Sequence, residues 1–106
     1  MLFEWDENKN LSNQLKHRIS FQNAIPVFDD PYLLSKPDHR FDYFEERWQS
    51  IGLAEKFLLT VVHTVENDHE EEIIRIISAR KARTCEARRY RVNQGYERGI
   101  TSVKGL

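Results

Sequence analysis

The chain of 106 residues contains little cysteine, glycine or proline. Its single cysteine, Cys85, excludes an internal disulfide and is too little for a metal site built from thiolates. This sparing use of cysteine fits a reducing compartment, so we expect the protein in the cytoplasm. With only four glycines and three prolines, the chain has no glycine-rich phosphate loop, no internal repeat and no low-complexity tract.

Long apolar runs are also missing. The longest run, residues 57–62, is interrupted by Thr60 and is far too short to cross a bilayer. The first ten residues, MLFEWDENKN, have neither the basic start nor the apolar stretch of a signal peptide. We therefore expect no secretion signal and no association with a membrane.

The residues that are present suffice for one domain with a modest core. Hydrophobic residues make up 40% of the chain, which is enough for a single small globular unit. We expect this domain to occupy residues 1–94. Residues 95–106 contain three of the four glycines, and we expect them to form a flexible tail.

Charge is distributed unevenly along the chain. The net charge is −1, yet the segment from Arg80 to Arg98 holds seven basic and two acidic residues. This segment therefore carries +5 and the remainder −6. A basic segment on an acidic body favours a polyanion site or a surface that binds a partner or a second copy. A plain solvated helix would have the same composition.

The most informative stretch is EEIIRIISARKARTCEARRY, residues 71–90. Its β-branched run, residues 73–77, is typical of a strand buried on both faces. Only Arg75 interrupts this run, and it needs a carboxylate partner or a route to water because an isolated buried charge is costly.

A helix is expected to follow directly on this strand. Ser78 is a good N-cap, so we expect the strand to end near it and Arg80 and Lys81 to lie in the first helical turn. We expect the head group of Arg80 to reach solvent. A strand of the core would then present two cations at the start of a helix, where a phosphate could bind.

Two helices are predicted near the N-terminus, after a short strand over residues 2–5. The first covers residues 7–16 behind the N-cap Asp6, with Leu11 and Leu15 on its core face. The second begins after Ser20 and should be short or bent, because Pro26 cannot donate the helical hydrogen bond.

Four further strands are predicted, and they complete an α+β domain. We expect residues 57–65 and 72–79 to form an antiparallel hairpin around a short polar loop. The other two strands cover residues 32–35 and 47–53, and the long loop 38–46 lies between them. The order is β-α-α-β-β-β-β-α, with two helices covering one face of a mainly antiparallel sheet.

Three separated motifs resemble the BrnT toxins of bacterial type II toxin–antitoxin systems, a family with a RelE-like ribonuclease fold. They are F-x-W-D-x-x-K-x-x-x-N-x-x-K-H at residues 3–17, E-R-W-x-x-I-G at residues 46–52, and R-I-I-S-A-R-K-A at residues 75–82 followed by Glu86 and Tyr90. The chain departs from the family pattern at Arg18, where glycine is common, and at Pro26 within the second helix.

The resemblance implies a toxin that acts as a metal-independent endoribonuclease and inhibits translation. It implies no cofactor and no metal. It also implies neutralisation by a cognate ribbon-helix-helix antitoxin, with a homodimer or a toxin–antitoxin heterotetramer as the assembly.

An enzyme of this kind uses the 2′-hydroxyl of RNA as nucleophile and needs a base, an acid and cations for the phosphate. Arg80 is the first candidate for the phosphate clamp, since a guanidinium forms two parallel hydrogen bonds; the alternative is an exposed arginine without a role. Arg47 is the second candidate clamp, unless it pairs with Glu45 or Glu46.

Candidates for proton transfer are Glu46 and His63. Each has a plainer alternative, since Glu46 could be solvated and His63 could be a hydrogen-bonded core residue. Tyr90 could contact RNA or simply pack. The remaining candidate RNA-binding residues are Arg75, Lys81, Arg83 and Glu86.

The sequence leaves two rivals to a ribonuclease. One is a non-catalytic module whose basic helix binds nucleic acid or a protein. The other is a DNA-binding repressor, which is disfavoured because no helix-turn-helix pattern appears. His17, His39 and His69 are too dispersed to make a metal-ligand spacing.

Overall fold

The computed structural model describes the backbone of residues 1–39 and 45–105 and the side chains of residues 1–39 and 45–95. The elements are β1 (Leu2–Glu4), α1 (Glu7–His17), α2 (Phe21–Ala24), the 3-10 helix η1 (Ile25–Asp29), β2 (Leu34–Pro37), β3 (Trp48–Ala54), β4 (Phe57–Asp68), β5 (Glu71–Lys81) and α3 (Thr84–Gly105). The predicted α+β class and the predicted order of elements are confirmed.

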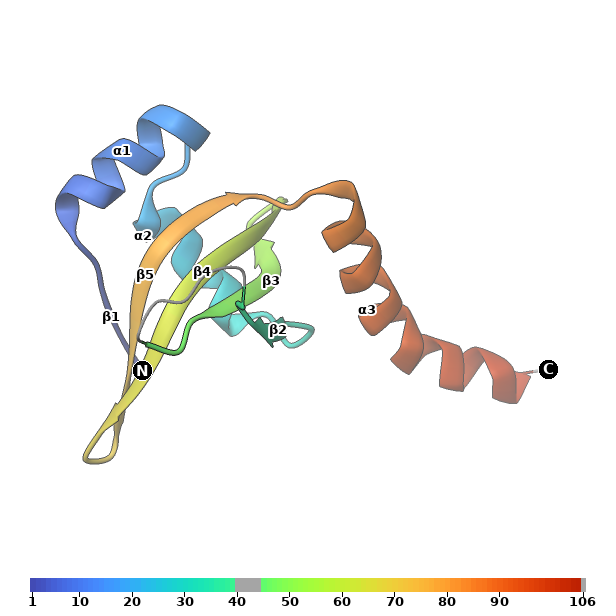
Figure 1. Cartoon of the computed structure of the whole chain (residues 1–106). Coiled ribbons are helices and arrows are strands. Elements are labelled where there is room, and N and C mark those ends of the chain that lie inside the picture. Colours follow the sequence, from blue (N-terminus) through green and yellow to red (C-terminus); the bar gives the residue numbers. More distant parts are fainter. Residues whose placement is uncertain (40–44, 106) are drawn as a thin grey trace.

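The five strands form one mixed sheet in the order β1-β5-β4-β3-β2. Three of the four pairings are antiparallel, and β1 runs parallel to β5. No turn connects β1 to β5, because all elements from α1 to β4 lie between them in sequence, so a parallel pairing is open to them. Figure 1 shows α1 and α2 on one side of the sheet and α3 leaving the end of β5.

The β4–β5 hairpin was predicted correctly and is longer than expected, with strands of 12 and 11 residues. The expected helix start at Ser78 is wrong. Ser78 pairs with Val62 and Arg80 pairs with Thr60, so both remain in the strand. The pairing with β4 continues to Lys81, and it outweighs the capping preference of one serine.

The tail residues 95–105 fall within α3, which runs to Gly105. The sequence had placed these residues in a flexible tail beyond the domain. Figure 1 shows the far end of this helix extending away from the sheet.

The core lies between the sheet and the short helical segment α2–η1. Phe21, Val27, Val61, Ile74 and Ile76 are among its largest fully buried side chains. The second helix is short, as predicted, and continues from Ile25 as a 3-10 helix that takes Pro26 into its first turn.

The predicted core face of α1 is wrong. Leu11 and Leu15 are exposed, whereas Asn10 and Asn13 are buried. Asn13 donates to the carbonyls of Ile19 and Ala79 at 2.9 and 2.8 Å and accepts from the Ala79 N–H at 3.1 Å. The helix therefore docks onto β5 through the Asn13 side chain, which bonds backbone groups. The periodicity of apolar residues cannot predict a contact of this kind.

The end of α1 is set by Arg18. As predicted, Asp6 caps the start of the helix, accepting from the backbone of Asn8 and Lys9. Arg18 adopts a left-handed conformation, with φ 60°, and its N–H donates to the Gln14 carbonyl. The left-handed turn is the one that glycine favours, and it directs the chain from α1 back across the sheet.

Candidate active site

Two cavities meet at the β5–α3 connection, and Arg80 and Arg83 line both. The larger one, about 600 Å³, lies between the end of α1, the β3–β4 turn and the end of β5. We call it the basic cavity. Its lining includes the cationic side chains Lys16, Arg18, Arg80, Lys81 and Arg83.

The second cavity, about 450 Å³, lies beside β2, β3 and the first turns of α3. It adds further positive charge, since Lys36 and Arg89 line it with Arg80 and Arg83. The β5–α3 connection is therefore flanked by cations on both sides.

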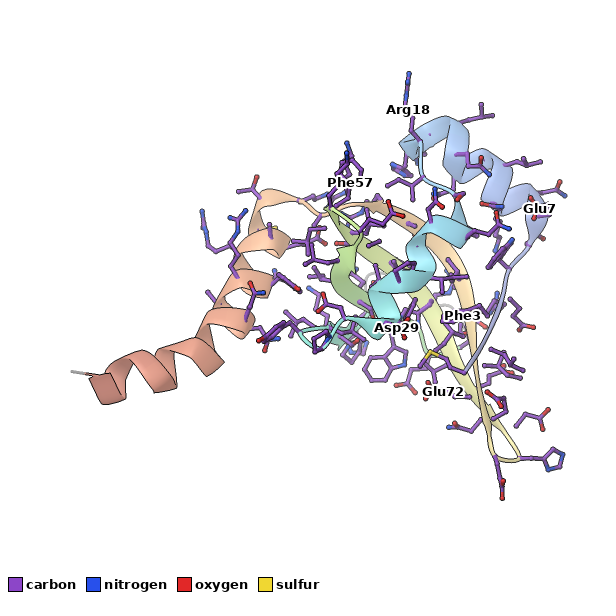
Figure 2. The ribbon with its side chains drawn as sticks, turned by 180° about the vertical axis from the view of Figure 1, so that it is seen from behind. Phe3, Glu7, Arg18, Asp29, Phe57 and Glu72 are labelled. Carbon is purple, nitrogen blue, oxygen red and sulfur yellow. The ribbon has the colours of Figure 1, made fainter. Side chains whose placement is uncertain are left out.

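The basic cavity forms because three chain reversals fall at the same end of the sheet. Arg18 turns the chain after α1, Glu55 turns it between β3 and β4 with φ 57°, and β5 ends at Lys81. Figure 2 shows Arg18 and Phe57 at this end of the molecule, although 38 positions separate them in the sequence. Among the described lining residues, Glu55 is the only acidic one, so the cavity favours anions.

Arg80 is held by Glu86. Its Nη1 donates to Oε1 at 2.7 Å and its Nη2 to Oε2 at 2.9 Å, and the Arg83 N–H donates to Oε1 at 2.8 Å. The expectation that Arg80 reaches solvent is wrong, since its side chain is only 15% exposed. A bidentate pair fixes the plane of the guanidinium more strictly than a single hydrogen bond would.

The environment of Glu86 keeps it ionised. Burial on its own would raise the pKa of Glu86, but the hydrogen bonds from Arg80 and from the Arg83 backbone, with the charge of Arg80, lower that pKa to about 2. At neutral pH the carboxylate therefore acts as an acceptor that orients Arg80, not as a proton donor.

His17 is a site residue that the sequence analysis did not select. It is half-buried and lines the basic cavity. Burial, followed by the charges of Lys16 and Arg80, lowers the pKa of His17. The imidazole is therefore mainly neutral at neutral pH and can accept a proton. The Lys16–His17 pair in the first motif was the available signal.

Tyr90 packs within the protein. It is buried, and its hydroxyl donates to Asp30 Oδ2 at 2.6 Å. Asp30 also accepts from the N–H groups of Tyr32 and Leu53. Burial first, and then the hydrogen bond and charge of Asp30, raise the pKa of Tyr90. Asp30, the residue directly after η1, thus anchors α3.

His63 also lies inside the protein, outside the described linings of both cavities. It is 3% exposed, its Nε2 lies 2.6 Å from Ser50 Oγ, and its ring meets that of Phe28 edge-on. Burial lowers the pKa of His63, while its contact with the Thr64 carbonyl acts in the opposite direction. This is the arrangement of a hydrogen-bonded core histidine.

The remaining candidates gather around Glu45. Arg75 Nη2 donates to Glu45 Oε2 at 2.6 Å and Arg47 Nε donates to Oε1 at 3.1 Å, so both arginines have carboxylate partners. The hydrogen bond from Arg75 is the main reason that the pKa of Glu45 is lowered. Glu46 is exposed. Residues 40–44 of the predicted long loop lie outside the described residues.

The cation-lined cavity at one end of the sheet has the electrostatic character of a site for anions. The protein-family model described as "Ribonuclease toxin, BrnT, of type II toxin-antitoxin system" matches residues 5–86, so the chain belongs to the BrnT family. This confirms the resemblance seen in the three motifs. No curated protein matches the chain.

Family membership implies an antitoxin protein as partner, since the family consists of type II toxins. Across residues 1–39 and 45–105, no helix is long and apolar enough to cross a membrane. Among residues 1–39 and 45–95, whose side chains are described, no three histidine, cysteine or acidic residues gather where they could hold a metal ion.

Proposed function

We propose that the protein is an endoribonuclease toxin that cleaves RNA in the basic cavity without a metal ion. The observation that carries the proposal is the convergence of five cationic side chains and one imidazole on a single cavity. RNA offers a phosphate for the cations and a 2′-hydroxyl proton for the imidazole. Membership of a ribonuclease family supports the same assignment.

In the proposed reaction, neutral His17 takes the proton from the 2′-hydroxyl, and the resulting oxygen attacks the adjacent phosphorus. The bond from phosphorus to the 5′-oxygen breaks, and that oxygen takes a proton from water, giving a 2′,3′-cyclic phosphate and a 5′-hydroxyl end. Arg80, held in place by Glu86, with Lys16 and Arg83, stabilises the added charge on the phosphate. A preorganised guanidinium suits this role because it does not reorganise during the reaction.

In the cell, we propose that RNA cleavage inhibits translation in the cytoplasm until a cognate ribbon-helix-helix antitoxin binds. The cation-rich surface around the two cavities would attract an acidic segment of such an antitoxin. Blocking this surface would exclude RNA. The assembly would be a toxin–antitoxin heterotetramer or, for the toxin alone, a homodimer. The α+β order with its mixed sheet is compatible with a RelE-like topology.

The test is cleavage of an end-labelled RNA by purified protein in EDTA, with analysis of the product ends. We expect cyclic phosphate ends for the wild type. His17→Ala should cleave about 10²–10⁴-fold more slowly, the usual contribution of an acid–base group. His69→Ala is the matched control, because His69 is exposed in the β4–β5 turn, far from the cavity.

Wild-type protein that binds RNA in EDTA but leaves it intact would replace this proposal with the non-catalytic binding module. If His17→Ala cleaves at the rate of His69→Ala, the base is another residue.

A further inference from the structure

A partly exposed aromatic ring lines the basic cavity. Phe57 is the first residue of β4, directly after the β3–β4 turn, and it is 45% exposed. It lines the cavity together with three apolar neighbours from α1–α2, β3 and β4: Ile19, Ala54 and Leu59. The cavity therefore has an apolar wall as well as a cationic one.

Two lysines lie close to this ring. Lys81 Nζ is 4.9 Å and Lys56 Nζ is 5.8 Å from the centroid of Phe57. Each ammonium is attracted by the ring and is solvated on its other side. Both ammonium groups lie over the ring, so a flat ligand that stacks there displaces an ammonium from that face and brings its own phosphates within reach of the two lysine side chains.

Single exposed apolar residues are ordinary on protein surfaces, so exposure alone assigns nothing to Phe57. Leu53 lies on the same β3–β4 hairpin and is 41% exposed, but it is outside the described linings of both cavities. Phe57 differs from Leu53 because it offers an aromatic face and lies beside both the apolar wall of the cavity and two cations.

A nucleotide has the chemistry that matches this combination, with a flat base on one side and phosphates on the other. Aromatic side chains beside backbone-binding cations are the usual platform for single-stranded nucleic acid. A base inside a duplex is already stacked on both faces, so only an unpaired base can use such a platform. The cavity volume of about 600 Å³ falls within the range of small-ligand sites.

We propose that Phe57 and the apolar wall beside it bind one unstacked base of single-stranded RNA, while Lys56 and Lys81 contact the phosphates next to that base. This subsite rests on the proposed function, because it positions the RNA strand that the basic cavity cleaves. Stacking on the ring uses only the flat face of a base, which all four bases have, so the subsite tolerates different bases. Because that face is covered inside a duplex, the subsite selects single strands.

The test uses a single-stranded RNA with 2′-O-methyl groups, which cannot be cleaved through the 2′-hydroxyl, and a duplex of the same sequence. Binding is measured by fluorescence anisotropy at one fixed salt concentration. Phe57→Ala should bind the single strand about 5- to 150-fold more weakly, the loss expected for one stacked base. Phe57→Trp should restore binding, and Leu53→Ala should match the wild type.

A set of single strands, each with one abasic site, provides the decisive comparison. At the position that contacts the ring, removal of the base should weaken binding by the wild type and leave binding by Phe57→Ala unchanged. Equal losses for the two proteins at every abasic position would overturn the subsite, because the ring would then act independently of any base.

Unchanged single-strand affinity of Phe57→Ala would also overturn the subsite. Melting curves check that this variant is folded, which its exposed position favours. If the wild type cleaves RNA while Phe57→Ala binds normally, only the subsite fails. If the wild type neither binds nor cleaves RNA, the proposed function fails with it.

Discussion

At the scale of single residues, the most constrained group in the site is the Glu86 carboxylate. Its side chain is 6% exposed and receives two hydrogen bonds from Arg80 and one from the Arg83 backbone. Truncation of Arg80 would leave this carboxylate buried without its main partner, at a cost of about 1–3 kcal/mol. Arg80→Ala should therefore lose stability as well as any activity, contrary to the expectation for an arginine in a solvated helix.

The pH dependence of stability follows from the pKa of Glu86. The folded-state pKa, about 2, lies below the ordinary value of 4.5, so the carboxylate stabilises the fold above pH 4.5. That contribution is lost as pH falls from about 4.5 through 2, because the unfolded chain then binds the proton first. Urea denaturation between pH 7 and pH 2 should show a steeper acid loss for the wild type than for Glu86→Gln.

The control for this experiment is Glu66→Gln, at an exposed position on the distal part of the β4–β5 hairpin. It should keep the acid dependence of the wild type. Parallel pH curves for the wild type and Glu86→Gln would show that the pair with Arg80 contributes nothing to folding.

At the scale of elements, the buried side chain of Asn13 bonds α1 to the sheet. We predict that Asn13→Ala lowers the free energy of unfolding by about 1–3 kcal/mol, because it leaves the N–H and carbonyl of Ala79 without their partner. Leu11→Ala should change it by less than about 0.5 kcal/mol, since Leu11 is exposed. Urea denaturation of both variants tests this. A larger loss for Leu11→Ala would contradict the described orientation of α1.

The same elements show how far the sequence could be read. The β4–β5 hairpin and the cap at Asp6 were predictable because alternation and capping are local patterns. The start of α3 was not, because the pairing of Ser78 with Val62 in β4 depends on tertiary structure. The orientation of α1 was not predicted correctly either, because its buried face is formed by asparagines, which do not appear in a pattern of apolar residues.

The candidate site was partly predictable for the same reason. Arg80, Lys81 and Arg83 are neighbours in sequence, and all three line the basic cavity. His17 and Phe57 join them only through the fold, so neither was selected. For His63, the alternating pattern of a strand was compatible with a catalytic or a core position, and only the bonds to its ring distinguish the two.

At the scale of the whole molecule, the position of α3 depends on Asp30. This carboxylate accepts hydrogen bonds from Tyr90, Tyr32 and Leu53, and so connects α3 with the start of β2 and with β3. The hydrogen bond of Asn93 to the Tyr32 carbonyl, at 3.2 Å, is weaker support one turn further along the helix. Because Glu86 lies on the same helix, the position of α3 also determines how Arg80 is held.

Removal of the Tyr90 hydroxyl should therefore loosen the helix without unfolding the sheet. We predict that Tyr90→Phe lowers the free energy of unfolding by about 1.5–3 kcal/mol, the usual range for a hydrogen bond to a charged group. Amide hydrogen exchange should rise over residues 84–95 through local opening of the helix, while the amides of β4 and β5 should remain protected against such local opening, because opening of a helix does not require global unfolding. Val92→Ala, at a 63% exposed position on the same helix, is the control and should exchange like the wild type. Equal exchange in Tyr90→Phe and the wild type would show that packing alone holds α3, and that the position of Arg80 does not depend on Asp30.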